Sequence, residues 1–215
     1  MTSVAEQIGD AVVLLSGGQD SAACLQIACE RHHKVYAVGF DYGQRHVVEL
    51  EAAQRIANLY DVPFTIIECS SFRQLGNSGL IDGQIGVSAK SAFVPGRNVV
   101  FLGVAAAFAM GHDADHIYIG ACKSDTMPDC QRDFITQMEC AITLAMGKLI
   151  HVHAPLLSLG KRGMLKLAKQ APKLMEALSL SISCYHGTRC GRCRACLARA
   201  TSYASMLMRD PAVKD

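Results

Sequence analysis

Leu14-Leu15-Ser16-Gly17-Gly18-Gln19-Asp20-Ser21 is the stretch of sequence that decides the fold of this 215-residue chain. It ends a short β-rich run, residues 11–15, and it opens a segment with helical spacing, residues 21–31. Two adjacent glycines let the backbone turn sharply and approach a ligand without a Cβ in the way. The helix that follows directs its free N–H groups and its positive dipole end at this turn. The stretch therefore predicts a phosphate-binding loop.

The residues of the loop limit which ligands it can bind. The chain contains neither the Gly-x-x-x-x-Gly-Lys-Ser/Thr of a Walker loop nor the Gly-x-Gly-x-x-Gly of dinucleotide sites. A nest of backbone N–H groups with the hydroxyls of Ser16 and Ser21 suits pyrophosphate. Asp20 either helps to hold Mg²⁺ or caps the helix. A tight strand–helix turn without a ligand is the structural alternative.

The loop begins a regular alternation of strands and helices. Strands are expected at residues 11–15, 34–40, 63–68, 116–120 and 150–153, and helices at 21–31, 47–60, 98–110 and 130–146. This pattern predicts a doubly wound α/β fold, a parallel sheet covered on both faces, with active-site loops at the carboxyl ends of the strands. The Gly- and Ser-rich residues 70–91 are expected to form a mobile loop or lid. Residues 1–160 are interpreted as the nucleotide-binding domain and 161–215 as a helical, cysteine-rich segment.

Composition limits the class of protein. Half of the residues are apolar and 19% are charged, which is typical of a globular chain, and a net charge of +2 gives no argument for a nucleic-acid or membrane partner. The N-terminus lacks the pattern of a secretion signal, and the longest apolar run, residues 99–110, is shorter than the roughly 20 residues of a membrane span. We expect a soluble, cytoplasmic protein, in which clustered cysteines are metal ligands rather than disulfides.

A cysteine cluster near the C-terminus predicts a metal site. Its members are Cys184, Cys190, Cys193 and Cys196, the last three spaced as Cys-x-x-Cys-x-x-Cys. Four sulfur ligands close a tetrahedral zinc site and leave no position for water, so the zinc is expected to be structural. An iron–sulfur cluster is the alternative, but nothing else in the sequence indicates redox chemistry.

The cysteine cluster lies in a locally basic segment. Its arginines are Arg189, Arg192, Arg194 and Arg199. RNA binding is one interpretation of them. The preferred interpretation is a solvated surface that balances the negative charge of four thiolates around one zinc ion.

Several motifs carry a resemblance to known enzymes. Ser16 to Ser21 resembles the signature of the PP-loop ATP pyrophosphatases, which split ATP between the α and β phosphates. Three further segments resemble the 7-cyano-7-deazaguanine synthase (QueC) family: Asp41-Tyr42-Gly43-Gln44-Arg45-His46, Phe93-Val94-Pro95-Gly96-Arg97-Asn98 and Pro128-Asp129-Cys130. With the cysteine cluster, the resemblance covers residues 13–200. It implies a Rossmann-like PP-loop fold with a C-terminal helical zinc-binding subdomain.

The resemblance also implies an activity. Members of this family convert 7-carboxy-7-deazaguanine and ammonia to 7-cyano-7-deazaguanine, in queuosine and related deazapurine biosynthesis. The carboxylate and then the amide are adenylated, so two ATP molecules are spent, each with Mg²⁺. The implied partners are these small molecules and a second copy of the chain in a homodimer, with no membrane and no direct nucleic-acid ligand.

The same resemblance assigns roles to residues. ATP binding falls to Leu14, Leu15, Ser16, Gly17, Gly18, Gln19, Asp20, Ser21, Ala22, Ala23 and Cys24. Substrate binding falls to Asp41, Tyr42, Gln44, Arg45, Arg97, Asn98, Asp125 and Asp129, and catalysis to Asp20, Arg97 and Lys161. The Arg97 guanidinium suits a phosphate or carboxylate, or else a surface salt bridge. Lys161 either neutralises charge on the α-phosphate or is an exposed lysine.

Some features depart from the family pattern and keep other functions open. Five residues separate Cys184 from Cys190, where a longer Gly-rich loop is expected. Residues 124–128 form a shortened stretch, in which Met127 replaces an aromatic residue, and Gln131 replaces an arginine. These last changes fall in the expected substrate loop, so an enzyme that stops at the amide, or that transfers the carboxyl to another amine, is an alternative.

Two other functions also involve a nucleotide-binding loop and a cysteine-rich segment. A tRNA thiolation enzyme also carries a PP-loop and cysteines, but it needs a catalytic cysteine pair and an RNA-binding appendage, for which this chain has neither the length nor the basic surface. A non-catalytic nucleotide-binding module, with the zinc segment docking a partner, is the alternative from a different class.

Overall fold

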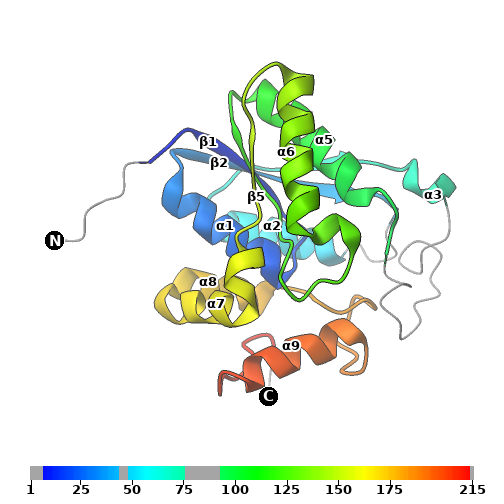
Figure 1. Cartoon of the computed structure of the whole chain (residues 1–215). Coiled ribbons are helices and arrows are strands. Elements are labelled where there is room, and N and C mark those ends of the chain that lie inside the picture. The colour runs from blue at the N-terminus through cyan, green and yellow to red at the C-terminus, as the bar shows by residue number, and fades with distance from the viewer. Residues whose placement is uncertain (1–6, 44–47, 76–92, 214–215) are drawn as a thin grey trace.

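The computed structural model describes residues 7–43, 48–75 and 93–213. Its centre is a parallel sheet of five strands in the order β3-β2-β1-β4-β5 (Figure 1). The strands are β1 (Asp10–Leu14), β2 (Lys34–Asp41), β3 (Phe64–Glu68), β4 (His116–Tyr118) and β5 (His151–His153). The strand order reverses at β1, which pairs with β2 on one side and β4 on the other. In such a sheet the loops diverge at the reversal and leave a crevice at the carboxyl ends of the strands.

Helices cover both faces of the sheet. One face carries α1 (Gln19–Arg31), α2 (Val48–Leu59), α7 (Leu156–Gln170) and α8 (Pro172–Leu180), and the other carries α5 (Arg97–Gly111) and α6 (Arg132–Met146). Successive side chains of β1 alternate between these layers, since Val13 packs toward α1 and Val12 toward α5. The short elements are α3 (Phe72–Leu75) and the 3₁₀ turn η2 (Pro128–Cys130), and α9 (Arg194–Ala204) follows the cysteine cluster. The predicted doubly wound α/β fold is confirmed.

The strands and helices expected from the sequence begin and end within two residues of the observed ones. The helix expected from residue 130 begins at Arg132, because Pro128–Cys130 form a separate 3₁₀ turn. The lid expected at residues 70–91 begins with α3, and its greater part lies outside the described residues. In the part of the chain that the structure describes, no helix combines the length and apolar character of a membrane span.

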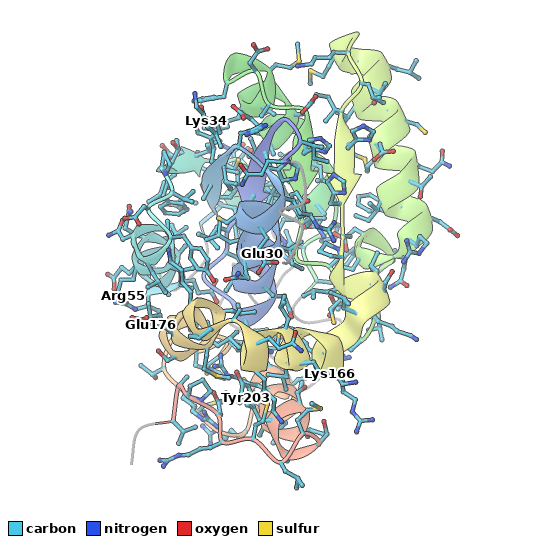
Figure 2. All side chains as sticks on the ribbon, turned by 90° about the vertical axis from the view of Figure 1, so that its left-hand side faces the viewer. Glu30, Lys34, Arg55, Lys166, Glu176 and Tyr203 are labelled. Carbon is cyan, nitrogen blue, oxygen red and sulfur yellow. The ribbon has the colours of Figure 1, made fainter. Side chains whose placement is uncertain are left out.

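The C-terminal helices share a core with the sheet. The expected boundary at residue 160 falls inside α7, at Gly160, whose φ of 60° and ψ of −176° interrupt the helix. Beyond this kink, Met164 of α7 and Leu174 of α8 are fully buried in the same cluster as α1. Tyr203 of α9 also reaches this cluster, between α9 and the α7–α8 pair (Figure 2). The division into two domains stays a prediction.

Arg199 corrects the expectation that the arginines near the cysteines are solvated. Its side chain is buried, and its Nε and Nη2 each donate to a carboxylate oxygen of Asp210 at 2.9 Å. Further bonds run from Nη1 to the Ser181 hydroxyl at 2.8 Å and from Nη2 to the Leu178 carbonyl at 2.8 Å. Arg189 also donates to Asp210, at 2.9 Å. The charge on Arg199 therefore ties α9 and the C-terminal residues to the end of α8.

Four histidines, from the end of α1 and from strands β4 and β5, lie together. The rings of His32 and His116 lie 4.5 Å apart, and His116 Nδ1 lies 2.8 Å from His153 Nε2. The ring of His151 stacks on His116 at 5.0 Å. Burial, followed by the neighbouring histidines, lowers the pKa of His153 to about 4. Burial likewise lowers the pKa of His32 and of His116.

This cluster makes stability depend on pH. The folded-state pKa of His153 is below its unfolded value of about 6.5, so the unfolded chain takes up the proton first as the pH falls. The free energy of unfolding should therefore drop between pH 7 and pH 5. The variant His153→Gln should reduce that drop by roughly 1 kcal/mol, after allowance for solvent screening. Urea unfolding at pH 7 and at pH 5 measures the free energy of unfolding of each variant.

The control is His33→Gln, which removes an exposed histidine from the same region. It should leave the drop between pH 7 and pH 5 unchanged. An equal drop in the wild type and in His153→Gln would contradict the assignment.

Candidate active site

A cavity of about 460 Å³ opens at the carboxyl end of the sheet. It lies where the strand order reverses, and its walls come from segments far apart in the sequence. These are the phosphate loop, the end of β2, the first turns of α2 and α5, the loop after β4, Lys161 of α7 and the segment around the cysteine cluster. A crevice at this point is the usual ligand site of a doubly wound sheet.

The phosphate loop is held by its own hydroxyls. Ser21 Oγ donates to the Gly18 carbonyl at 3.0 Å and accepts from Ser16 N–H at 3.2 Å. Gly17 has a φ of +79°, and a Cβ on it would lie 2.1 Å from the Glu49 carbonyl oxygen. Any other residue at this position would therefore push α2 away from the loop. The backbone at the start of α1 is thus fixed in place for an anion.

Asp20 and Lys161 lie in contact beside this loop. Lys161 Nζ donates to both carboxylate oxygens of Asp20. The side chain of Lys161 is only 17% exposed and that of Asp20 only 24%. Lys161 follows Gly160 directly, and the kink there turns the chain at the start of the main part of α7. The structure therefore brings together two of the three residues that the sequence predicts to be catalytic, from positions 141 residues apart.

Arg97, the third of these residues, lies on another wall with Tyr42. Arg97 Nη1 donates to Tyr42 Oη at 3.3 Å, and the guanidinium carbon lies 5.5 Å from the centre of the Tyr42 ring. Asn98 is buried and donates to the Asp129 carbonyl at 3.0 Å. The rings of Phe40 and Phe101 stack in parallel at 4.1 Å and also line the cavity. This wall is aromatic with one cation, a surface that suits a flat heterocycle bearing negative charge.

Hydrogen bonds from Cys122 and from Gln131 fasten the loop after β4. Cys122 N–H donates to Asp125 Oδ2 at 2.8 Å. The Gln131 side-chain amide donates to the carbonyls of Asp125 and Met127, at 2.8 Å and 3.0 Å. Burial raises the pKa of Asp125. Gln131 therefore holds the cavity-lining residues in place without lining the cavity itself.

The four cysteines fit a structural zinc site. The Sγ atoms of Cys184, Cys190, Cys193 and Cys196 lie within 4.8 Å of one another. Backbone N–H groups point at the sulfurs, from Cys190 to Cys184 Sγ at 3.4 Å and from Cys193 to Cys190 Sγ at 3.3 Å. Gly191, with a φ of +70°, makes the turn inside the cluster. Four converging sulfurs are the ligand set of a closed tetrahedral zinc site, and the short spacing between the first two does not prevent it.

The zinc segment also forms a wall of the cavity. Ser183 and Tyr185 precede the second cysteine, Arg194 and Ala195 lie between the third and the fourth, and all four line the cavity. Burial raises the pKa of Tyr185. The metal ligands therefore fix residues that face the site. Arg194 is exposed, as expected, and it also lines the cavity.

The predicted site residues separate into two groups. Those that line the cavity are Leu14, Leu15, Ser16, Gly18, Gln19, Asp20, Ser21, Tyr42, Arg97, Asn98, Asp125 and Lys161. Those that do not are Gly17, Ala22, Ala23, Cys24, Asp41 and Asp129. Ala22, Ala23 and Cys24 are fully buried because they face the core side of α1. Gln44 and Arg45 lie outside the described residues.

The cavity residues that the sequence did not predict include three ionisable ones, Glu49, Tyr185 and Arg194. Glu49 is in the first turn of α2, where an acid usually indicates no more than a favourable helix dipole. Burial raises the pKa of Glu49 to about 7. Its position beside Gly17 is a tertiary contact and left no signal in the local sequence.

Comparison with known proteins identifies the family of this chain. The family model described as "Queuosine biosynthesis protein QueC" matches residues 10–207. The curated 7-cyano-7-deazaguanine synthase of Laribacter hongkongensis is 42% identical over 94% of this chain and 93% of its own. That of Bacillus subtilis is 36% identical over 92% of this chain and 95% of its own.

Solved structures support the fold. A crystal structure of a "predicted subunit of tRNA methyltransferase" from Methanocaldococcus jannaschii has a TM-score of 0.54 and 17% identity, covering 75% of each chain. At that identity the likeness shows the fold alone. The match of the family model to nearly the whole chain, together with these relatives, shows that the chain belongs to the QueC family.

Proposed function

We propose that this chain is an ATP-dependent carbon–nitrogen ligase that converts 7-carboxy-7-deazaguanine and ammonia to 7-cyano-7-deazaguanine. The observation that carries the proposal is one cavity in which a pyrophosphate-type loop, the Asp20–Lys161 pair and the Arg97–Tyr42 wall face the same space. Relatives that are 36% and 42% identical over nearly their whole length bear the name of this enzyme. The choice of substrate in the proposal rests on that name.

The first step activates the carboxylate. A carboxylate oxygen attacks the α-phosphorus of ATP, pyrophosphate leaves, and an acyl-adenylate forms. The free N–H groups at the start of α1 bind the phosphates, and the Lys161 ammonium neutralises the charge that develops on the α-phosphate. Mg²⁺ bound with ATP would supply positive charge at the phosphates, and Asp20 is the acid placed to hold it. Lys161 keeps Asp20 paired until then.

The later steps make the nitrile. Ammonia attacks the acyl carbon and AMP leaves, which gives the amide. The amide oxygen then attacks the α-phosphorus of a second ATP and pyrophosphate leaves. Loss of AMP and of two N–H protons from the O-adenylated amide gives the nitrile. The guanidinium of Arg97 is suited to bind the carboxylate or the phosphate, because it presents paired donors. Tyr42, Asn98 and Asp125 are assigned to the heterocycle.

The assembly and surroundings of the enzyme follow from the same proposal. We infer a cytoplasmic homodimer that acts on small molecules and has no direct nucleic-acid ligand. The inference rests on the family resemblance and on the near-neutral charge of +2, which gives no argument for a nucleic-acid partner.

The direct test is mass spectrometry of a reaction with ATP, Mg²⁺, ammonium and 7-carboxy-7-deazaguanine. The proposal predicts the nitrile, with two AMP for each product molecule. Amide that accumulates without nitrile would limit the enzyme to the first activation. Unchanged substrate would contradict the assignment of the substrate.

Lys161→Met should lower the rate of AMP formation by about 10²- to 10³-fold, because the α-phosphate loses its neutralising charge. The matched control is Lys166→Met, which removes an exposed lysine from the same helix (Figure 2). It should leave the rate within twofold of the wild type. Equal rates for the two variants would contradict the role of Lys161.

Zinc removal should destabilise the whole chain, because the cysteine cluster anchors a wall of the cavity and adjoins α9. The purified protein should contain one zinc per chain by elemental analysis. Cys193→Ser should lose the zinc and lower the melting temperature by about 10 °C or more. Cys140→Ser, at an exposed cysteine of α6, is the control. Iron with the visible absorption of an iron–sulfur cluster would contradict the zinc assignment.

A further inference from the structure

Glu49 is an acid in the cavity to which the proposed function gives no role. Its half-buried side chain lines the cavity, and its main chain packs against Gly17 of the phosphate loop. Arg97, whose charge stabilises the ionised carboxylate, and Tyr42 also line the cavity. Within the described residues the Glu49 carboxylate has no hydrogen-bond or ion-pair partner. The group is therefore held between the phosphate loop and the Arg97–Tyr42 wall, and it is free to accept a proton.

The proposed reaction needs such a group. When neutral ammonia forms a C–N bond with the acyl carbon, the nitrogen carries a positive charge until a proton leaves. The C–O bond to the adenylate then breaks, and the products are amide, AMP and one proton. In the second activation the O-adenylated amide loses one N–H proton to give the imidate. A second N–H proton leaves as the C–O bond breaks, which gives nitrile and AMP.

We propose that Glu49 is the general base that removes these protons from nitrogen. The inference rests on the proposed function. The acyl carbon has to lie next to the α-phosphate, which the loop binds, and Glu49 is the acid whose helix packs on that loop. Asp20 is less suited, because Lys161 holds both of its oxygens in this structure and the proposed function assigns it to Mg²⁺ once ATP is bound.

The electrostatics of the cavity agree with this role. Burial raises the pKa of Glu49 to about 7, and Arg97 acts in the opposite direction. A carboxylate with a pKa near the working pH both accepts and releases protons efficiently. The other charged or titratable groups that line the cavity are Asp20, Tyr42, Arg97, Asp125, Cys130, Lys161, Tyr185 and Arg194. Asp125, whose pKa burial also raises, is bound by the Cys122 N–H and is less available as a base.

The experiment separates adenylation from the ammonia steps. Exchange of labelled pyrophosphate into ATP, with 7-carboxy-7-deazaguanine but no ammonia, reports the first activation alone. Glu49→Gln should keep this exchange within a few-fold of the wild type. With ammonia, the kcat for amide and nitrile should fall by about 10²- to 10⁴-fold, the usual contribution of a general base. Glu49→Asp keeps a proton acceptor and should retain more activity than Glu49→Gln.

Two further readouts distinguish a base from a structural residue. Hydroxylamine is a weaker base than ammonia, and its adduct releases a proton more readily, so Glu49→Gln should lose less of its rate with this nucleophile. The wild-type rate per free ammonia should fall as the pH drops below about 7, where Glu49 becomes protonated. The exchange reaction should not show that fall. Glu51→Gln, an exposed acid on the same helix, is the control and should behave as the wild type.

Three results would overturn the proposal. Equal loss of exchange and of ammonia-dependent turnover in Glu49→Gln would show a structural role. A raised KM for 7-carboxy-7-deazaguanine with unchanged kcat would make Glu49 a group that binds the heterocycle. If the wild type exchanged no pyrophosphate into ATP in the presence of this carboxylate, the proposed function itself would be contradicted, and the inference about Glu49 with it.

Discussion

The close fit of the phosphate loop between its neighbours is the constraint on which the rest of this structure depends. A Cβ on Gly17 would meet the Glu49 carbonyl at 2.1 Å, and one on Gly120 would meet Ser21 N at 3.0 Å. Glycine at both positions lets α2 and the end of β4 approach the start of α1 from opposite sides. That approach lies at the reversal of strand order, so one backbone arrangement fixes the sheet, the crevice and the anion site together.

The groups that do the chemistry come from outside this loop. Lys161 reaches Asp20 because the backbone kinks at Gly160, and Arg97 begins a helix on the opposite face of the sheet. The cysteine cluster adds a wall that the sheet and its two layers of helices do not provide. A zinc ion held by the four cysteines would thus fix the position of residues such as Tyr185 and Arg194. The buried Arg199–Asp210 pair holds the same segment from the other side.

The sequence predicted the parts of this arrangement that local patterns encode. The alternating strands, the phosphate loop and the spacing of the cysteines each lie within one short segment, so their physics can be read there. Glu49, Tyr185 and Arg194 could not be predicted, because only the packing of α2 and of the zinc segment turns them toward the cavity. Arg199 was misinterpreted for the same reason. An arginine in a basic stretch is usually solvated, and Asp210, its buried partner, is not part of that stretch.

In the proposed reaction, the phosphate loop directs attack at the α-phosphorus of ATP. The measurement is the fate of ¹⁸O in 7-carboxy-7-deazaguanine labelled in both carboxylate oxygens, followed by mass spectrometry of every phosphate product. The account predicts one ¹⁸O in each AMP, since each oxygen leaves the substrate attached to an α-phosphate. Label in inorganic phosphate would show attack at the γ-phosphorus and would contradict the assignment of the loop and of the residues around it.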